Sequence, residues 1–295
     1  MRLYANGTEL TTVAKRVTLE KSRGEAAATL TAVLVTDLAD RYLQKESLAL
    51  GDAVRLLSDA GDEVFLGAVQ AVSRNVETVT VTACDRGLYL TANELSGVFA
   101  GAPEGICRAV AARLRLSCGT IEAPAGRKRL VAGAGVRAFD ILRQAVGEGY
   151  EISLAGGALT VKKAGGERFA LAEESVLTSV GTADARKMVN RCVVVGRKGN
   201  AAASAQNAAD LARFGQRQSV VGKSGDAAAQ AAAALRGRTL RGELTVLGDL
   251  KYRCGALVEL HRPDWGIDGA YPLTAVKHRW ARGIFTTELT WEGEA

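Results

Sequence analysis

The sequence predicts a mainly β protein of the α+β class, with two barrel-like β units and a small α+β insertion between them. Three observations lead to this fold class. Apolar and threonine side chains alternate with a period of two, as in residues 78–83, which is typical of half-buried strands. Glycine supplies 33 of the 295 residues and proline only 4, so glycine must form most turns between short strands. Similar strand and turn patterns also recur near both ends of the chain.

The first ninety residues are expected to form strands. Residues 29–34 alternate in the same way as residues 78–83. A turn at Gly61 separates two apolar runs, residues 53–59 and 63–72, and this arrangement predicts a β-hairpin. Residues 37–43 form the one short helix expected in this part.

The middle of the chain, residues 97–165, predicts a small α+β insertion. A helix is expected over residues 103–116, because a proline opens it and an apolar stripe follows. The stripe consists of Ile106, Val110 and Leu114. A second helix from about residue 136 to residue 148 and a hairpin over residues 150–163 complete the insertion.

The last third returns to strands after an alanine-rich stretch. Residues 188–197 read as a strand. Residues 201–237 are expected to be mostly helical and to pack on a surface, because alanine favours helices but buries little area. The remaining strands are expected at residues 239–248, 255–262, 270–280 and 283–291.

The recurrence between the two ends predicts a duplication. Gly51 opens one strand and hairpin pattern, and Gly255 opens a similar one 204 residues later. Gly67 and Gly269 make a second pair, 202 residues apart. We therefore expect two superposable β units, and one continuous sheet or mismatched glycines would contradict this expectation.

The charge balance carries little functional information. The net charge is +6 and the isoelectric point is about 9.1. The basic residues gather in two small groups, Arg127-Lys128-Arg129 and Arg236 with Arg238 and Arg241. A solvated loop and a helix C-terminus explain these groups better than nucleic-acid binding does. We expect no membrane span and no export signal, since no stretch reaches about 20 apolar residues.

Five cysteines, Cys84, Cys107, Cys118, Cys192 and Cys254, are widely spaced. The absence of any Cys-x-x-Cys pair excludes a zinc ribbon and a thioredoxin-type motif. We expect all five thiols to be reduced, as in a protein assembled in the cytoplasm.

Two glycine-rich motifs fail as nucleotide sites. Residues 133–138 resemble a dinucleotide fingerprint, but the alternating strands and helices of a Rossmann fold are missing. Residues 222–224 resemble the end of a phosphate loop, yet Arg217 stands where that loop needs glycine.

No convincing active site can be assembled from the sequence. His261 with Asp264 could hold a metal or a water, but no second ligand pair is evident, and His278 is the only other histidine. No Gly-x-Ser-x-Gly elbow is present, and the Glu173-Glu174 pair is expected in a solvated loop. We therefore expect no catalytic, cofactor-binding or metal-binding residues, and no enzyme.

The chain resembles the baseplate hub proteins of contractile phage tails and phage-tail-like bacteriocins. It is most similar to the branch of Gram-positive bacteria and their prophages, known as the XkdQ/YqbQ or late control D type. The segments that carry the resemblance are residues 48–52, 79–90, 188–200, 244–255 and 276–291. Each segment is a strand and turn pattern, and their joint order gives the resemblance its specificity.

The resemblance implies a homotrimer in which each subunit carries two tube-type β-barrel domains. These domains would be residues 1–96 and 166–295, around the insertion at 97–165. Six barrels would then form a ring that joins the sixfold tail tube to the threefold central spike. The implied partners are the tail tube or tube-initiator protein, the spike protein, other baseplate proteins, and tape-measure protein or DNA in the lumen. The implied location is the phage or tailocin particle, assembled in the bacterial cytoplasm, with no cofactor and no membrane contact.

Two other classes of function stay open. A peptidoglycan-degrading or cell-wall-binding tail-tip enzyme would need a deep cleft with a carboxylate or histidine of shifted pKa. A nucleic-acid-binding protein with open barrels would need exposed aromatic residues beside basic ones. The aromatic residues near the C-terminus are expected in a barrel core or interface instead: Trp265, Trp280, Phe285 and Trp291.

Overall fold

A computed structural model of the chain describes residues 1–36, 48–155, 157–171 and 175–294. The helix expected at residues 37–43, Gly156 of the expected hairpin turn, and the Glu173-Glu174 pair lie outside the described residues.

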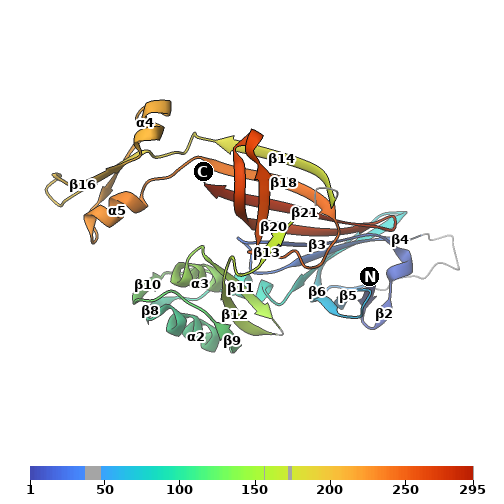
Figure 1. The fold of residues 1–295 in the computed structure, drawn as a ribbon. Helices are drawn as coiled ribbons and strands as arrows, with labels where there is room; N and C mark the ends of the chain where they lie inside the picture. Colours follow the sequence, from blue (N-terminus) through green and yellow to red (C-terminus); the bar gives the residue numbers. More distant parts are fainter. Residues whose placement is uncertain (37–47, 156, 172–174, 295) are drawn as a thin grey trace.

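The described chain begins and ends in strands (Figure 1). The first part contains β1 (Arg2–Ala5), β2 (Thr8–Glu9), a 3₁₀ turn (Thr11–Val13), β3 (Ala14–Ser22), β4 (Thr29–Val35), β5 (Ala53–Leu57), β6 (Glu63–Arg74), β7 (Thr78–Asp85) and α1 (Leu88–Ala92). The insertion contains β8 (Gly97–Gly101), α2 (Pro103–Arg113), β9 (Ser117–Ile121), β10 (Lys128–Ala132), α3 (Ala138–Val146), β11 (Tyr150–Ala155) and β12 (Ala158–Lys163).

The last part contains β13 (Arg168–Ala170), β14 (Val176–Asp184), β18 (Thr239–Leu247), β19 (Leu257–Arg262), a 3₁₀ turn (Pro263–Trp265), β20 (Ile267–Ala281) and β21 (Ile284–Glu294). Between β14 and β18 the chain forms β15 (Arg191–Val195), β16 (Ala201–Gln206), α4 (Ala208–Phe214), β17 (Gln218–Gly222) and α5 (Ala227–Ala233).

The alternation of apolar and threonine side chains builds the main sheet. Leu30 and Ala32 of β4 are buried and stand opposite Ala83 and Val81 of β7. The threonines between them point to the other face of the sheet, because side chains alternate along a strand. The strands expected at residues 29–34 and 78–83 and the hairpin of β5 and β6 are therefore confirmed.

The same strand order occurs twice. Strands β3 to β7 lie side by side in the order β5-β6-β7-β4-β3. The second set, β14 with β18 to β21, lies in the order β19-β20-β21-β18-β14. Numbered along the chain within each set, both orders are third, fourth, fifth, second, first. The duplication that the sequence predicts is thus present in the topology.

The two sets do not form separate sheets. Residues 275–281 of β20 pair antiparallel with residues 16–22 of β3, so one 13-stranded sheet runs through both sets. The expectation of separate sheets is wrong, because the edge of β3 that β4 leaves free is occupied by β20. The mainly β fold class is confirmed, and the domain limits at residues 96 and 166 stay a prediction.

The insertion packs α2 and α3 around one core. Ile106, Val110 and Leu114 are buried, as the stripe predicts. Helix α2 ends at Arg113, before the predicted end, because Arg115 takes a left-handed φ of 55°. Arg143 of α3 attaches the insertion to the main sheet, since its guanidinium donates to the carbonyl oxygen of Arg23 at 2.6 Å.

Residues 185–238 form a small unit that we call the arm. Figure 1 shows the arm (β15, β16, β17, α4 and α5) standing away from both β sets. The expectation that residues 201–237 are mostly helical is wrong, because β16 pairs with β15 and the two helices have only seven residues each. The arm fills the connection between β14 and β18, where the first set has only the loop between β3 and β4.

Candidate assembly interface

Two turns of matching geometry lead into β5 and β19. Gly51 has a φ of 88° and Gly255 a φ of 87°. The amide of Gly51 donates to the carbonyl of Val69 and the amide of Gly255 to the carbonyl of Leu273, both at 2.9 Å. The amide of each acceptor residue bonds back to the residue after the glycine, at 2.9 and 2.8 Å. The predicted match of Gly51 with Gly255 is therefore confirmed.

The second predicted match, Gly67 with Gly269, is wrong. The turns align Val69 with Leu273, which places Gly67 opposite Tyr271 of the second set. Gly67 is required for close packing, since a Cβ there would lie 2.4 Å from the carbonyl oxygen of Cys84. Gly269 instead has a φ of 143° and open space around it. The two glycines thus serve different purposes and resemble each other only in sequence.

Irregularities of the ladders also recur in the same places. The register breaks between Val69 and Ala71 in β6, between Leu273 and Ala275 in β20, between Ala14 and Arg16 in β3, and between Val176 and Thr178 in β14. An extra residue in a strand re-aims all that follow it, so a bulge in the same place makes the two strands equivalent residue by residue. Strand β20 therefore follows β6 with an offset of 204 residues, and β14 follows β3 with an offset of 162 residues.

The joint between the two sets is a seven-residue antiparallel ladder. It runs from Ala275 opposite Ser22 to Ala281 opposite Arg16. On the core side, His278 stands opposite Leu19 and Trp280 opposite Val17. The joint brings together strands that are about 260 residues apart in the chain.

Two strand edges have no partner strand within the part of the chain that the structure describes. Strand β14 pairs with β18 on one side only, and the opposite side is the β14 edge. Beyond Ala68, where the pairing with β5 stops, β6 pairs only with β7; its other side over residues 70–74 is the β6 edge. Large apolar side chains are exposed at both edges: Leu177 and Val180 of β14, and Val76 next to β6. Unpaired backbone beside exposed apolar side chains favours pairing with another chain.

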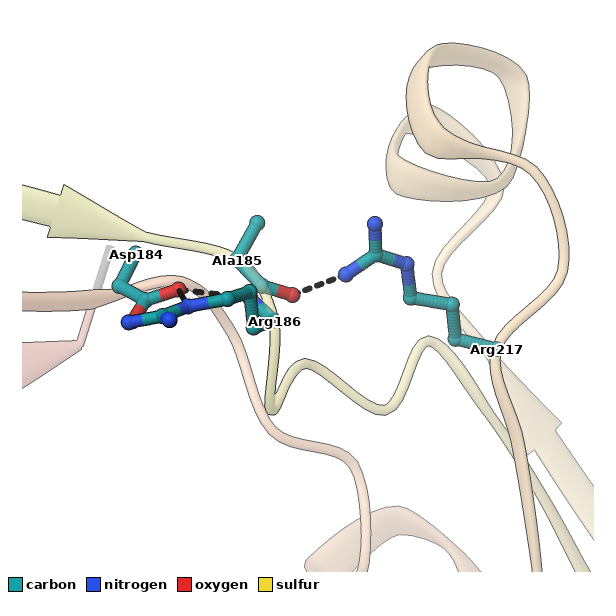
Figure 2. A network of polar contacts seen from close by, with 4 residues as sticks. All are labelled: Asp184, Ala185, Arg186 and Arg217. Atoms are coloured by element: carbon teal, nitrogen blue, oxygen red, sulfur yellow. Dashed lines mark hydrogen bonds and ion pairs between the residues drawn. The ribbon is translucent and has the colours of Figure 1, made fainter.

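A polar network fixes the point where β14 passes into the arm (Figure 2). The Asp184 carboxylate accepts hydrogen bonds from Nη2 of Arg186 at 2.6 Å and from its backbone amide at 2.8 Å. The Arg186 side chain holds the pKa of Asp184 well below its ordinary value. The guanidinium of Arg217, from the arm, donates to the carbonyl oxygen of Ala185. The end of the β14 edge is therefore held in place from both sides.

The face of the sheet that turns away from the cores is rich in threonine. We call it the threonine face; its threonines include Thr18, Thr31, Thr80, Thr82, Thr245, Thr286 and Thr290. Its charged residues have both signs and include Arg16, Glu20, Glu243, Lys277, Arg279 and Glu288. Lys277 and Glu288 lie 3.3 Å apart. A mixed face of this kind lacks the continuous basic surface that nucleic-acid binding needs.

At one end, the threonine face forms a hollow of about 620 Å³. Its cationic residues are Lys15, Arg16, Arg279 and Arg282. Aromatic side chains do not line this hollow, so the pattern of stacked bases beside basic residues is not met there.

The structure separates the two histidines that the sequence singles out. His261 is exposed, and its Nδ1 lies 2.9 Å from Oδ1 of Asp268, not in a pair with Asp264, whose side chain lies outside the described part. Across the described residues no group of three or more histidine, cysteine or acidic side chains could hold a metal ion.

His278 is buried in the core of the joint. Its Nδ1 lies 3.0 Å from Oγ1 of Thr287, and its ring lies beside Trp280 and Phe285. Burial lowers the pKa of His278 to about 4. The shifted pKa therefore comes from packing and not from a cleft open to substrate.

The two glycine-rich motifs take part in ordinary connections. Residues 133–135 link β10 to α3, and β10 pairs antiparallel with β8, which is not a Rossmann arrangement. Ser224 donates from its amide to the side chain of Gln230 at 3.1 Å, in the link between β17 and α5. Of the aromatic residues, Trp291 is buried as expected, whereas Trp265 is 41% exposed. For the described residues, no helix combines the length and the apolar character that crossing a membrane requires.

Comparison with known proteins gives a family and a fold. The model of the YQBQ-like family matches residues 17–292. A search of curated proteins found no match.

Among solved structures, the 43 kDa tail protein of prophage MuSo2 from Shewanella oneidensis is similar with a TM-score of 0.73 and 14% identity, over 98% of this chain and 96% of that one. A tail protein from Neisseria meningitidis has a TM-score of 0.69 and 14% identity, over 99% and 95%. A component of the type VI secretion system of Escherichia coli, described as structurally similar to tail proteins of bacteriophage T4, has a TM-score of 0.61 and 10% identity, over 99% and 76%. The fold is therefore the one found in phage tail proteins.

Sequence reasoning missed the β14 and β6 edges. Which side of a strand is left unpaired depends on the register of distant strands, and no local pattern records it. The exposed Val180 in an otherwise polar stretch of β14 is the one sequence signal that could have indicated an edge.

Proposed function

The chain belongs to the YQBQ-like family, and from this membership we propose that it is the structural baseplate hub of a contractile injection system, a phage tail or a tailocin. In this proposal three copies form a ring that joins the sixfold tail tube to the threefold central spike. Its direct partners would be the tube or tube-initiator protein above, the spike protein below and other baseplate proteins around it.

The observation that carries the proposal is the repeated strand order of the main sheet. Two equivalent five-strand sets in one chain supply six equivalent sets when three chains close a ring. A threefold assembly can then present a near-sixfold surface to a sixfold tube, while its own symmetry matches a threefold spike. The similar fold of a type VI secretion component and of phage tail proteins supports the same role.

The threonine face would line the lumen of such a ring. Its short hydroxyl side chains and mixed charges offer no continuous site for a polyanion. A conduit must let tape-measure protein or DNA pass without holding it, and this face is suited to that task. Assembly in the bacterial cytoplasm and residence in the particle belong to the same proposal.

The role proposed is structural and not enzymatic. The alternative, a peptidoglycan-degrading or cell-wall-binding tail-tip enzyme, would have to use the exposed His261–Asp268 pair, since His278 is buried. Zymography on peptidoglycan at several pH values tests this alternative. Lysis that disappears in a His261→Ala variant would support the enzyme and contradict the structural role.

The symmetry of the assembly is the direct test of the hub. The mass of the purified protein or of its complex with the spike, measured by native mass spectrometry, should correspond to three chains. A map of the particle should show one such trimer on the tail axis, between tube and spike. Six copies, or copies away from the axis, would contradict the proposal.

A further inference from the structure

We propose that the copies in this ring are joined by antiparallel pairing of the β14 edge of one copy with the β6 edge of the next. The inference rests on the proposed function for the number of copies, but the joint itself follows from the geometry of a single chain. The occupant of each free edge is therefore the other free edge of a second copy.

The joint within the chain is the template for the joint between chains. Strand β3 pairs with β20 inside each copy. Strand β14 is equivalent to β3, and β6 is equivalent to β20, because the order, the turns and the bulges coincide. Three of the four strands' pairings with their own neighbours are matched, and only the contact of β14 with β6 is missing from the single chain.

The two offsets fix the register of this joint. Moving the β20 residues back by 204 positions and the β3 residues forward by 162 converts the internal pairs into pairs between copies. The resulting pairs are Ala71 with Asp184, Val72 with Ala183, Ser73 with Thr182, and Arg74 with Gly181. The internal pair Lys277 with Glu20 corresponds to Ser73 with Thr182.

The side chains suit this register on both faces of the sheet. Val72, which is half-buried against the first core, would meet the exposed Ala183 on the core side. Ser73 and Thr182 would meet on the other side and continue the threonine face from one copy to the next. No pair in the joint brings together two like charges.

The turn beside the β6 edge does not obstruct the joint. Arg74 donates to the carbonyl oxygen of Leu48 at 2.6 Å, so this turn lies next to the end of β6. In the second set the equivalent residues, His278 and Tyr252, are also in contact, and β3 nevertheless pairs with β20. The same arrangement thus permits a strand on that side.

Pairing of unlike edges also satisfies every edge of the ring. If two β14 edges paired with each other, a dimer would close and both β6 edges would stay open. Head-to-tail pairing uses one β14 edge and one β6 edge per copy, and a closed ring then leaves none of them exposed. This argument selects a second copy over a foreign strand.

Disulfide trapping of the full chain tests the register. In a background with Cys84→Ser and Cys118→Ser, the pair Ser73→Cys and Thr182→Cys is introduced and the protein is oxidised mildly. Residues directly opposite in an antiparallel pair lie within the Cα distance that a disulfide spans. Non-reducing gels should show covalently linked dimers and trimers.

Two matched variants control the experiment. The internal equivalent, Glu20→Cys with Lys277→Cys, should form its disulfide within one chain and give no linked species. Ser73→Cys with Thr178→Cys is out of register by four residues, about 13 Å along the strand, and should give about tenfold less linked chain.

The outcomes separate this inference from the proposed function. Trimers by native mass spectrometry without linkage of the Ser73–Thr182 pair, while the internal pair closes, would overturn the joint and leave the trimeric hub intact. Linkage that extends beyond three chains would support the joint and contradict the threefold ring. A protein that stays monomeric at high concentration and in the presence of the spike, and never links, would overturn both.

Discussion

Gly51 and Gly255 occupy the same position in two copies of one turn. Their φ angles are 88° and 87°, and each donates its amide to the strand that follows at 2.9 Å. This relationship ties two segments that share little sequence around the glycine, and it sets the offset with which the whole chain repeats. Since side chains other than glycine rarely adopt this φ, both turns depend on the residue type.

Replacement of either glycine by alanine should lower the stability of the protein. A left-handed conformation costs a residue with a Cβ about 1–2 kcal/mol, so Gly51→Ala should reduce the free energy of unfolding by about that amount. Gly255→Ala should reduce it at least as much, because its Cβ would also lie 3.1 Å from Oε2 of Glu151. Urea denaturation measures both values.

Gly24→Ala serves as the control for these variants. Gly24 has no left-handed φ and nothing within 4 Å of the position of a Cβ, so stability should stay within about 0.5 kcal/mol of the parent. Equal stability of the Gly51→Ala variant and the parent would contradict the equivalence of the two turns.

Local patterns predicted the strands and the insertion because burial follows local periodicity. The stripe of Ile106, Val110 and Leu114 and the alternation in β4 and β7 each specify which side of an element is buried. The duplication could also be predicted, since Gly51 and Gly255 lead into similar strands.

The joint and the edges could not be predicted in this way. The pairing of β3 with β20 depends on a register between segments far apart in the chain, and a bulge at Lys15 or Gln70 has no distinct sequence pattern. The alanines of β16 misled for a related reason: helix propensity is a weak prior that pairing with β15 overrides. Gly67 and Gly269 misled because a glycine is needed for several different reasons.

The buried histidine of the joint should make stability depend on pH. Burial lowers the pKa of His278 in the folded protein to about 4, whereas an unfolded histidine has a pKa near 6.5. Between these values the unfolded state binds more protons, so the stability contributed by neutral His278 is complete above about pH 6.5 and is lost as the pH falls toward 4. The loss should reach up to about 3 kcal/mol.

A His278→Gln variant isolates this effect, since glutamine can keep a hydrogen bond to Thr287 without titrating in this range. Urea denaturation of both proteins at several pH values should show a steeper fall below pH 6.5 for the parent. Parallel pH profiles would mean that His278 is accessible to protons in the folded state.

The five thiols should divide into two groups. Cys107, Cys192 and Cys254 are buried, and burial raises the pKa of Cys107 to about 11 and that of Cys254 to about 12. A thiol reagent at pH 8 should therefore react quickly with Cys84 and Cys118 only, because the thiolate is the reactive form. Denaturation without reductant should release five thiols, and a count of three would reveal a disulfide.

A negative charge at the β14 edge should prevent assembly without unfolding the chain. Ala183 is exposed in the single chain, so an Ala183→Glu substitution should change the free energy of unfolding of a monomer by no more than about 0.5 kcal/mol. In the inferred joint the new carboxylate would face Val72 on the core side and lose water without gaining a partner. Such burial costs at least about 1–3 kcal/mol per joint, which corresponds to about a tenfold or greater weakening at each of the three joints. Ala202→Glu, on the exposed strand β16 of the arm, is the matched control and should assemble like the parent. Light scattering over a range of concentrations measures both, and trimers of undiminished stability in the Ala183→Glu variant would show that the β14 edge stays in water.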